Sequence, residues 1–220
     1  MTNFDQVDKV SAQVIGDLEK HNKKLDVLVE NAGVSMRCEF VDYAFENHKA
    51  LFEVNVHGPY RHLQACLPHM IKNKSGQIVG VTSLAGKLAT AYRTSYAGSK
   101  HAFIGILDSL RTELKSHNVR VCNLMPGYIK TNLSLNAMAA GVGEKFGKTD
   151  TNIEKGMAPD LFAKEALGAI YNNENEVMVS DQWLPSIGVV LRNLCPDLFF
   201  MMMVRNAKNQ EKAVVNAKKQ

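Results

Sequence analysis

The stretch that decides the fold is Gln77-Ile-Val-Gly-Val-Thr82, a short apolar run rich in β-branched residues. A loop at residues 83–87 follows it, then a helical pattern over residues 94–116, and then a second apolar run, Val119-Arg-Val-Cys-Asn-Leu124, which Pro126-Gly127 ends. Two short strands joined by a helix of this length are typical of a βαβ unit, whose strands are parallel. This segment therefore predicts a parallel sheet covered by helices on both faces.

The same alternation continues on both sides of this unit. The other predicted elements are helices at residues 5–22, 45–72 and 160–172 and strands at residues 25–29 and 177–180. Residues 128–160 are irregular and rich in Gly, Thr and Asn. The order predicts an α/β fold, a Rossmann-like doubly wound parallel sheet, in one domain at residues 1–204 followed by a basic C-terminal tail at residues 205–220.

Three turns follow directly after predicted strands. They contain Asn31-Ala32-Gly33, Ser83 and Pro126-Gly127. Ligands of open parallel sheets bind beyond the carboxyl ends of the strands. The positions of these turns therefore predict a binding site that all three share.

Composition and charge narrow the class of protein. Of 220 residues, 45% are hydrophobic and 22% charged, which suits a globular domain. Residues 205–220 hold five basic side chains against Glu211 and account for the whole net charge of +4, so no nucleic-acid footprint is indicated. The four cysteines form no C-x-x-C pair, which argues against a zinc site or a disulfide framework and favours a reducing compartment. They are Cys38, Cys66, Cys122 and Cys195.

The chain shows neither a signal peptide nor a clear membrane-spanning run. Its first residues lack a basic region followed by an apolar one. Residues 184–204 come closest to a spanning segment, but Arg192, Pro196 and Asp197 interrupt them, so we predict a monotopic, membrane-facing patch instead. The basic tail is interpreted either as a solvated terminus or as a contact with an anionic membrane.

The segment Tyr96-Ala-Gly-Ser-Lys100 contains two side chains that could take part in proton transfer. Four residues apart on a helix, Tyr96 and Lys100 leave the same face one turn apart. An ammonium group beside a phenol favours the phenolate and lowers the phenol pKa, the tuning that a general acid or base needs near neutral pH. With Ser83 thirteen residues upstream of Tyr96, the sequence predicts a single proton-transfer site.

Together these motifs resemble the short-chain dehydrogenase/reductase family. The matching pieces run in family order over residues 1 to about 205: Asn31-Ala32-Gly33, Asn55, Ser83, Tyr96-x-x-x-Lys100 and Pro126-Gly127-Tyr-Ile-Lys-Thr131. Residues 126–134 and the ending from Leu184 to Phe200 resemble one branch, the membrane-anchored dehydrogenase/reductases.

The resemblance implies a role for each matching residue. Tyr96 would be the general acid/base, Lys100 would lower its pKa and bind the nicotinamide ribose, and Ser83 would hold the substrate oxygen. Asn55 would anchor a water that links Lys100 to solvent. The other cofactor-binding residues implied are Asn31, Ala32, Gly33, Pro126, Gly127 and Thr131; no metal is implied.

The chain departs from the family at its N-terminus. The family opens with a strand, a Gly-rich turn and a helix that receives the cofactor pyrophosphate. Residues 1–24 hold one glycine, Gly16, inside a predicted helix, so we expect an N-terminally truncated fold that lacks the first two βα units. A second departure is Glu30, where the family has Asn; a carboxylate there is expected to disturb the neighbouring turn.

Two main functional readings stay open. The first is an NADP-linked oxidoreductase (NAD is not excluded) that transfers a hydride between nicotinamide and the carbonyl or alcohol of an apolar or lipid-like substrate. The second is a truncated, catalytically inactive fragment or isoform that at most binds partners through its long helices. A third reading, a scaffold domain with an accidental motif, has the least support.

The resemblance also implies partners and a location. They are a homodimer through residues 45–72 and 94–116, peripheral membrane contact, and the cytoplasmic face of the endoplasmic reticulum or peroxisomal membrane.

Overall fold

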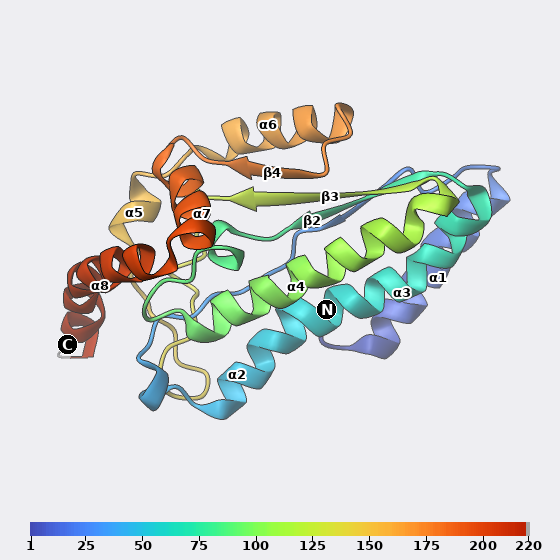
Figure 1. The fold of residues 1–220 in the computed structure, drawn as a ribbon. Coiled ribbons are helices and arrows are strands. Elements are labelled where there is room, and N and C mark those ends of the chain that lie inside the picture. Colours follow the sequence, from blue (N-terminus) through green and yellow to red (C-terminus); the bar gives the residue numbers. More distant parts are fainter. Residues whose placement is uncertain (219–220) are drawn as a thin grey trace.

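The structure, a computed structural model, describes residues 1–218, with side chains up to residue 207. Within this part of the chain, a parallel sheet in the order β1-β2-β3-β4 forms the centre (Figure 1). Its strands are Val27–Glu30, Gly76–Val81, Val119–Pro126 and Glu176–Val179. Every predicted strand is present, with boundaries shifted by at most two residues, which confirms the α/β fold.

Helices connect the strands as predicted. The α-helices are α1 (Phe4–Lys20), α2 (Phe45–Phe52), α3 (Gly58–Asn73), α4 (Thr94–Glu113), α5 (Thr151–Glu154), α6 (Pro159–Tyr171), α7 (Leu184–Leu194) and α8 (Pro196–Lys218). The Asn3 side chain caps α1 by accepting a hydrogen bond from the Gln6 N–H. The helix predicted at residues 45–72 is divided, because a π-helical turn at Glu53–His57 joins α2 to α3.

The main core lies between the sheet and the pair α3 and α4. Leu28, Ile78 and Val121, one from each of three strands, point to this side, where Phe103 and Leu107 of α4 are fully buried. Gly80 of β2 allows this close approach, because a Cβ there would lie 2.3 Å from Leu107 Cδ1. Since α4 carries Tyr96 and Lys100, its tight packing on β2 fixes them relative to the sheet.

The opposite face of the sheet is covered only in part. Val79, Cys122 and Leu124 pack against Ala166 and Ala169 of α6, which lies alone on that side of β3 and β4 in Figure 1. Val27 and Val29 of the edge strand β1 point to the same side and are 40% and 49% exposed. The predicted cover on both faces is therefore complete over β3 but not over β1.

The chain ends in two helices, α7 and α8. The boundary suggested by the sequence between residues 204 and 205 falls inside α8, and residues 219–220 of the predicted tail lie outside the described residues. Among the described helices, none is both long enough and apolar enough to cross a membrane.

Candidate active site

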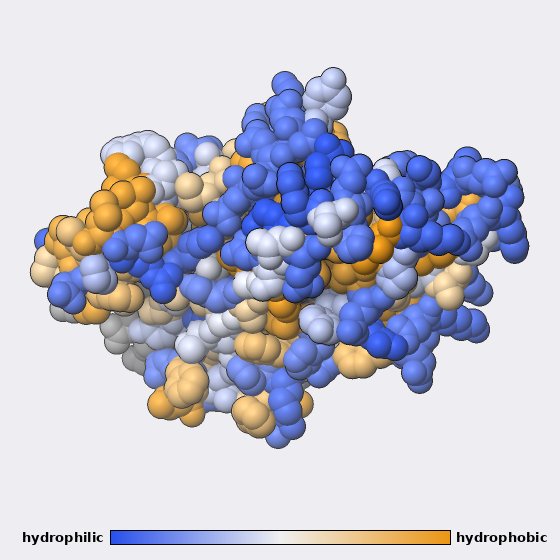
Figure 2. All heavy atoms as spheres, turned by 45° about the vertical axis from the view of Figure 1, so that its right-hand side comes forward, coloured by the Kyte–Doolittle hydropathy of each residue, from blue (hydrophilic) through white to orange (hydrophobic). Residues whose placement is uncertain are grey.

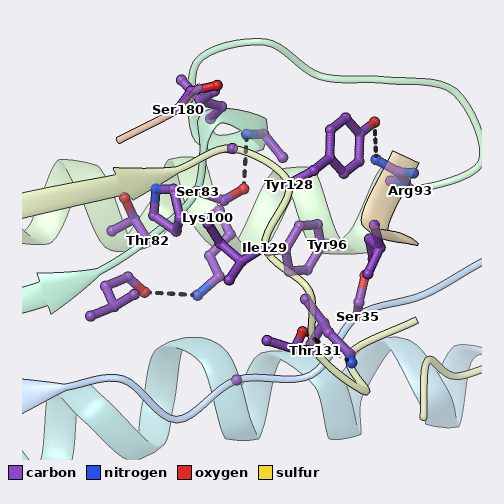
Figure 3. Close-up of a pocket in the computed structure, with 18 of the residues that line it drawn as sticks. Ser35, Thr82, Ser83, Arg93, Tyr96, Lys100, Tyr128, Ile129, Thr131 and Ser180 are labelled. Atoms are coloured by element: carbon purple, nitrogen blue, oxygen red, sulfur yellow. Dashed lines mark hydrogen bonds between the residues drawn. The ribbon is translucent and has the colours of Figure 1, made fainter. Parts of the chain in front are cut away.

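A cavity of about 580 Å³ opens at the carboxyl ends of the strands. Its walls come from the turn after β1, the ends of β2 and β3, the residues after β4, and the first turns of α4 (Figure 3). Eight predicted site residues line it: Asn31, Gly33, Ser83, Tyr96, Lys100, Pro126, Gly127 and Thr131. Ala32 and Asn55 do not; Ala32 is exposed and Asn55 is buried behind the wall.

Ser83, Tyr96 and Lys100 meet in this cavity. Ser83 lies two residues after the end of β2, and its Oγ accepts a hydrogen bond from the Ala85 N–H at 3.1 Å. Lys100 Nζ lies 5.9 Å from the centre of the Tyr96 ring and donates a hydrogen bond to the Val81 carbonyl oxygen at 3.1 Å. All three side chains are buried. The structure thus brings together the three groups of the predicted proton-transfer site.

Burial dominates the electrostatics of the pair. It raises the pKa of Tyr96 above its usual value, although a hydrogen bond with Ser83 and the charges of Arg37 and Arg93 act in the opposite direction. Burial also lowers the pKa of Lys100 to about 8. The sequence predicted a lowered Tyr96 pKa, but in the structure this pKa is raised. The reason is that desolvation destabilises the phenolate by more than the nearby cations stabilise it.

Asn55 acts on the backbone around the site. It sits in the π-helical turn and is almost fully buried. Its Oδ1 accepts the Val34 N–H at 2.8 Å, and its Nδ2 donates to the Val34 carbonyl at 2.9 Å and to Ser99 Oγ at 3.0 Å. Both amide hydrogens are thus used within the protein. Asn55 links α4 to the segment after β1, and the predicted water relay would have to use the remaining capacity of its Oδ1.

A charged cluster with two buried arginines borders the cavity, and sequence reasoning missed it. Arg93 Nη2 donates to Asp150 Oδ2 at 2.6 Å, and Arg37 Nη2 lies 3.4 Å from the same oxygen. Arg93 Nη1 also donates to the Tyr128 hydroxyl at 3.1 Å (Figure 3). Asp150 lies 57 residues from Arg93 and 113 from Arg37 in the chain, so no local sequence pattern predicts these two contacts. One carboxylate faces two guanidinium groups, which leaves this wall of the cavity positive.

Glu30 does not disturb the turn that follows it. Its side chain points away from the cavity toward α3, is buried, and lies 2.7 Å from His62 Nδ1. Hydrogen bonding to Cys66 and to Glu30 raises the pKa of His62 to about 10, so the imidazolium neutralises the carboxylate. The unusual Glu30 thus has a dedicated counter-ion.

Comparison with known proteins settles the family. A family model described as short chain dehydrogenase matches residues 1–140. The chain belongs to the short-chain dehydrogenase family. It is 39% identical, over 189 residues, to the bovine (Bos taurus) protein called dehydrogenase/reductase SDR family member 7B. That match covers 86% of this chain and 58% of the bovine protein, so the chain spans little more than half the length of this relative.

Two solved structures share this fold. A short-chain dehydrogenase from Streptomyces avermitilis superposes with a TM-score of 0.72 at 25% identity, covering 94% of this chain and 79% of the other. The protein ElxO, solved with NADPH bound, superposes with a TM-score of 0.55 at 27% identity, covering 59% of this chain and 51% of the other.

Proposed function

We propose that the chain carries the proton-transfer site of an NADP-linked oxidoreductase. The reaction would move a hydride between a nicotinamide and the carbonyl or alcohol carbon of an apolar or lipid-like substrate. The observation that carries this proposal is the meeting of Ser83, Tyr96 and Lys100 in one cavity at the carboxyl ends of the strands. A hydroxyl, a phenol and an ammonium group in reach of one substrate oxygen are the groups that such a reaction needs.

The cavity suits the nicotinamide end of a dinucleotide. A Cβ on Gly33 would lie 3.4 Å from Lys100 Nζ, and a Cβ on Gly127 would lie 2.8 Å from Ser180 Oγ. The missing side chain at Gly33 leaves backbone bare beside Lys100, where a flat ring could rest, whereas Gly127 lacks a Cβ because Ser180 packs against it. Asn31 and Thr131 line the same cavity. A bound nicotinamide would supply or accept the hydride. The choice of NADP over NAD follows the family resemblance and the NADPH held by ElxO.

The chain's own residues would handle the proton. Tyr96 holds its proton at neutral pH, because burial raises its pKa, and can donate it to a substrate oxygen as the oxygen becomes an alkoxide. Ser83 Oγ accepts a hydrogen bond from the Ala85 N–H and also hydrogen-bonds with Tyr96, so its hydroxyl would turn from the phenol oxygen to donate to the substrate oxygen. Lys100 and the Arg37–Arg93 wall would stabilise the phenolate that remains after proton transfer.

The remaining cavity wall supports an apolar substrate. Aliphatic and aromatic side chains from three segments line the same cavity as Tyr96. They are Leu84, Leu88, Ile129, Leu133, Ile153 and Phe162. Most come from the irregular segment between β3 and α6 or from the loop after β2, and loops of this kind often carry the residues that bind a ligand.

A second function is favoured by the free edge of the sheet. Backbone groups on the outer edge of β1 and the exposed Val27 and Val29 lack cover from the described residues. A catalytically inactive chain that binds partners would fit these facts. We also propose that the chain forms a homodimer through residues 45–72 and 94–116. Its proposed location is the cytoplasmic face of the endoplasmic reticulum or peroxisomal membrane.

Cofactor titration separates the two functions. NADPH and, in parallel, NADH are added to the purified 220-residue chain while nicotinamide fluorescence and thermal unfolding are followed. The oxidoreductase proposal predicts saturable binding of NADPH that the Tyr96→Phe variant retains, since the phenol hydroxyl is assigned to proton transfer. Cooperative unfolding with no response to either nucleotide would exclude the oxidoreductase and leave the partner-binding function.

A further inference from the structure

One face of α7 consists of large apolar side chains that nothing in the described structure covers. Trp183, Ile187, Val190 and Leu194 are spaced by four, three and four residues, so they lie along one side of the helix. They are between 51% and 75% exposed. An amphipathic helix of a soluble domain normally turns such a stripe toward the core. Here the stripe faces outward.

Helix α8 extends this surface. Phe199 is buried and holds α8 against α7, since a Cβ on Gly188 would lie 3.8 Å from the Phe199 ring. The side chains around it are exposed. We call the combined surface the C-terminal apolar face; it comprises Trp183, Leu184, Ile187, Val190, Leu194, Leu198, Phe200, Met201, Met202 and Val204. Apolar atoms gather on the left of Figure 2, where these helices lie. So many exposed apolar side chains on two adjacent helices are typical of an interaction site.

The charge of the neighbouring C-terminal segment indicates what binds to the C-terminal apolar face. The segment that follows the face, residues 205–220, holds five basic side chains and one acidic one, and Arg205 is exposed at the start of it. A second copy docked face to face would bring two such basic segments together, which is unfavourable. An anionic lipid surface offers hydrocarbon to the apolar side chains and negative charge to the basic ones.

The opposite side of α7 adjoins the cavity, so a single helix separates the cavity from the face. Pro185, in the first turn of α7, and Gln182 just before it line the cavity, and Leu88 of the cavity wall would be 3.1 Å from a Cβ on Gly188 of α7. A surface that seats on lipid here would place the cavity next to the bilayer. An apolar substrate that leaves the bilayer beside α7 would then have to travel only about one helix diameter to enter the cavity.

We propose that the C-terminal apolar face docks on an anionic lipid bilayer and that the helices lie in its interface. The link to substrate entry rests on the proposed function, but docking itself does not. Since each large aliphatic side chain that enters hydrocarbon favours binding, replacing two of them should weaken vesicle binding by at least about tenfold.

The test uses flotation of the purified chain with phosphatidylcholine vesicles, with and without phosphatidylserine. The parent chain is expected to float with the phosphatidylserine vesicles and to be released by salt. Ile187→Glu/Leu194→Glu should lose at least about tenfold in vesicle binding. The matched control is Val10→Glu/Val14→Glu on α1, where both residues are about half exposed, and it should float like the parent. Far-ultraviolet circular dichroism verifies that each variant is folded.

A second measurement uses Trp183, the only tryptophan in the chain. Its fluorescence should shift to the blue on vesicle addition and be quenched by brominated lipid. An unchanged spectrum, or equal flotation of the two double variants, would overturn the proposal. So would light scattering that shows a dimer for the parent and a monomer for Ile187→Glu/Leu194→Glu, because the occupant would then be a second copy. NADPH titration of the same samples distinguishes this failure from a failure of the proposed function.

Discussion

Arg93 Nη2 and Asp150 Oδ2 form a partly buried ion pair with a separation of 2.6 Å at the edge of the cavity. It fastens the irregular segment between β3 and α6 to the start of α4, one turn before Tyr96. Arg37 shares the same carboxylate oxygen at 3.4 Å. The pair therefore joins three segments that all contribute to the cavity wall.

Asp150→Asn should destabilise the protein strongly. The substitution leaves two buried guanidinium groups without a counter-charge, and breaking a buried ion pair from one side costs about 3–5 kcal/mol. Urea unfolding at neutral pH gives the free energy of unfolding of parent and variant. The matched control is Asp17→Asn, which removes an exposed pair with Lys20 and should cost less than about 1 kcal/mol. Similar small losses for both variants would show that Asp150 is not the counter-ion of a buried cluster.

Lys100→Met should make the protein more stable at neutral pH. Burial lowers the pKa of Lys100 from 10.5 to about 8, so the folded chain carries a buried charge that it disfavours. The variant keeps an apolar side chain of similar length without the charge. The expected gain at pH 7 is on the order of 1–3 kcal/mol.

The effect of Lys100→Met on the free energy of unfolding should depend on pH. Between the folded and unfolded pKa values of Lys100 the unfolded chain holds a proton that the folded chain has lost, so the stability of the parent should rise with pH over that interval. The advantage of Lys100→Met should therefore shrink as the pH rises from 8 toward 10.5. Unfolding curves at both ends of the interval measure it, with the exposed Lys115→Met as control. An advantage that stays constant with pH would contradict a lowered Lys100 pKa.

Gly33→Val should block the cofactor. A Cβ alone at this position would already lie 3.4 Å from Lys100 Nζ and from Asn55 Oδ1, and the branched side chain would fill the space above the backbone. We expect the affinity for NADPH to fall by at least about tenfold while the chain stays folded. Fluorescence titration measures the affinity. Unchanged NADPH affinity would place the nicotinamide elsewhere.

Gly16→Ala serves as the matched glycine control and is a prediction in itself. Gly16 lies inside α1, and a Cβ there would meet no atom within 4 Å. The substitution should raise the free energy of unfolding by about 0.5–1 kcal/mol and leave NADPH binding unchanged. Chemical unfolding provides the measurement; a destabilised variant would mean that α1 packs differently from the structure.

The parts of the site that the sequence predicted share one physical origin. Ser83, Tyr96 and Lys100 could be placed together because parallel strands end on one edge of a sheet and a helix brings residues four apart onto one face. Short apolar runs and helical spacing located the strands within two residues for the same reason. Local periodicity was enough for these features.

The rest depends on contacts between distant segments. Nothing local pairs Asp150 with Arg93 and Arg37, or Glu30 with His62, because these contacts arise only after the chain has folded. The direction of the Tyr96 pKa shift depends on burial, which a sequence motif does not reveal. The outward turn of Trp183 and Leu194 was likewise hidden, since the same spacing also suits a helix packed on a core.

The central claim is that Tyr96 transfers the proton in an NADPH-dependent reaction. The most direct test follows NADPH oxidation by the purified chain with a panel of apolar ketones and aldehydes, in parent and Tyr96→Phe. The parent should turn over at least one of them, and Tyr96→Phe should lower kcat by roughly a hundredfold or more with unchanged NADPH affinity. Turnover retained by Tyr96→Phe, or none by a parent that binds NADPH, would contradict the claim.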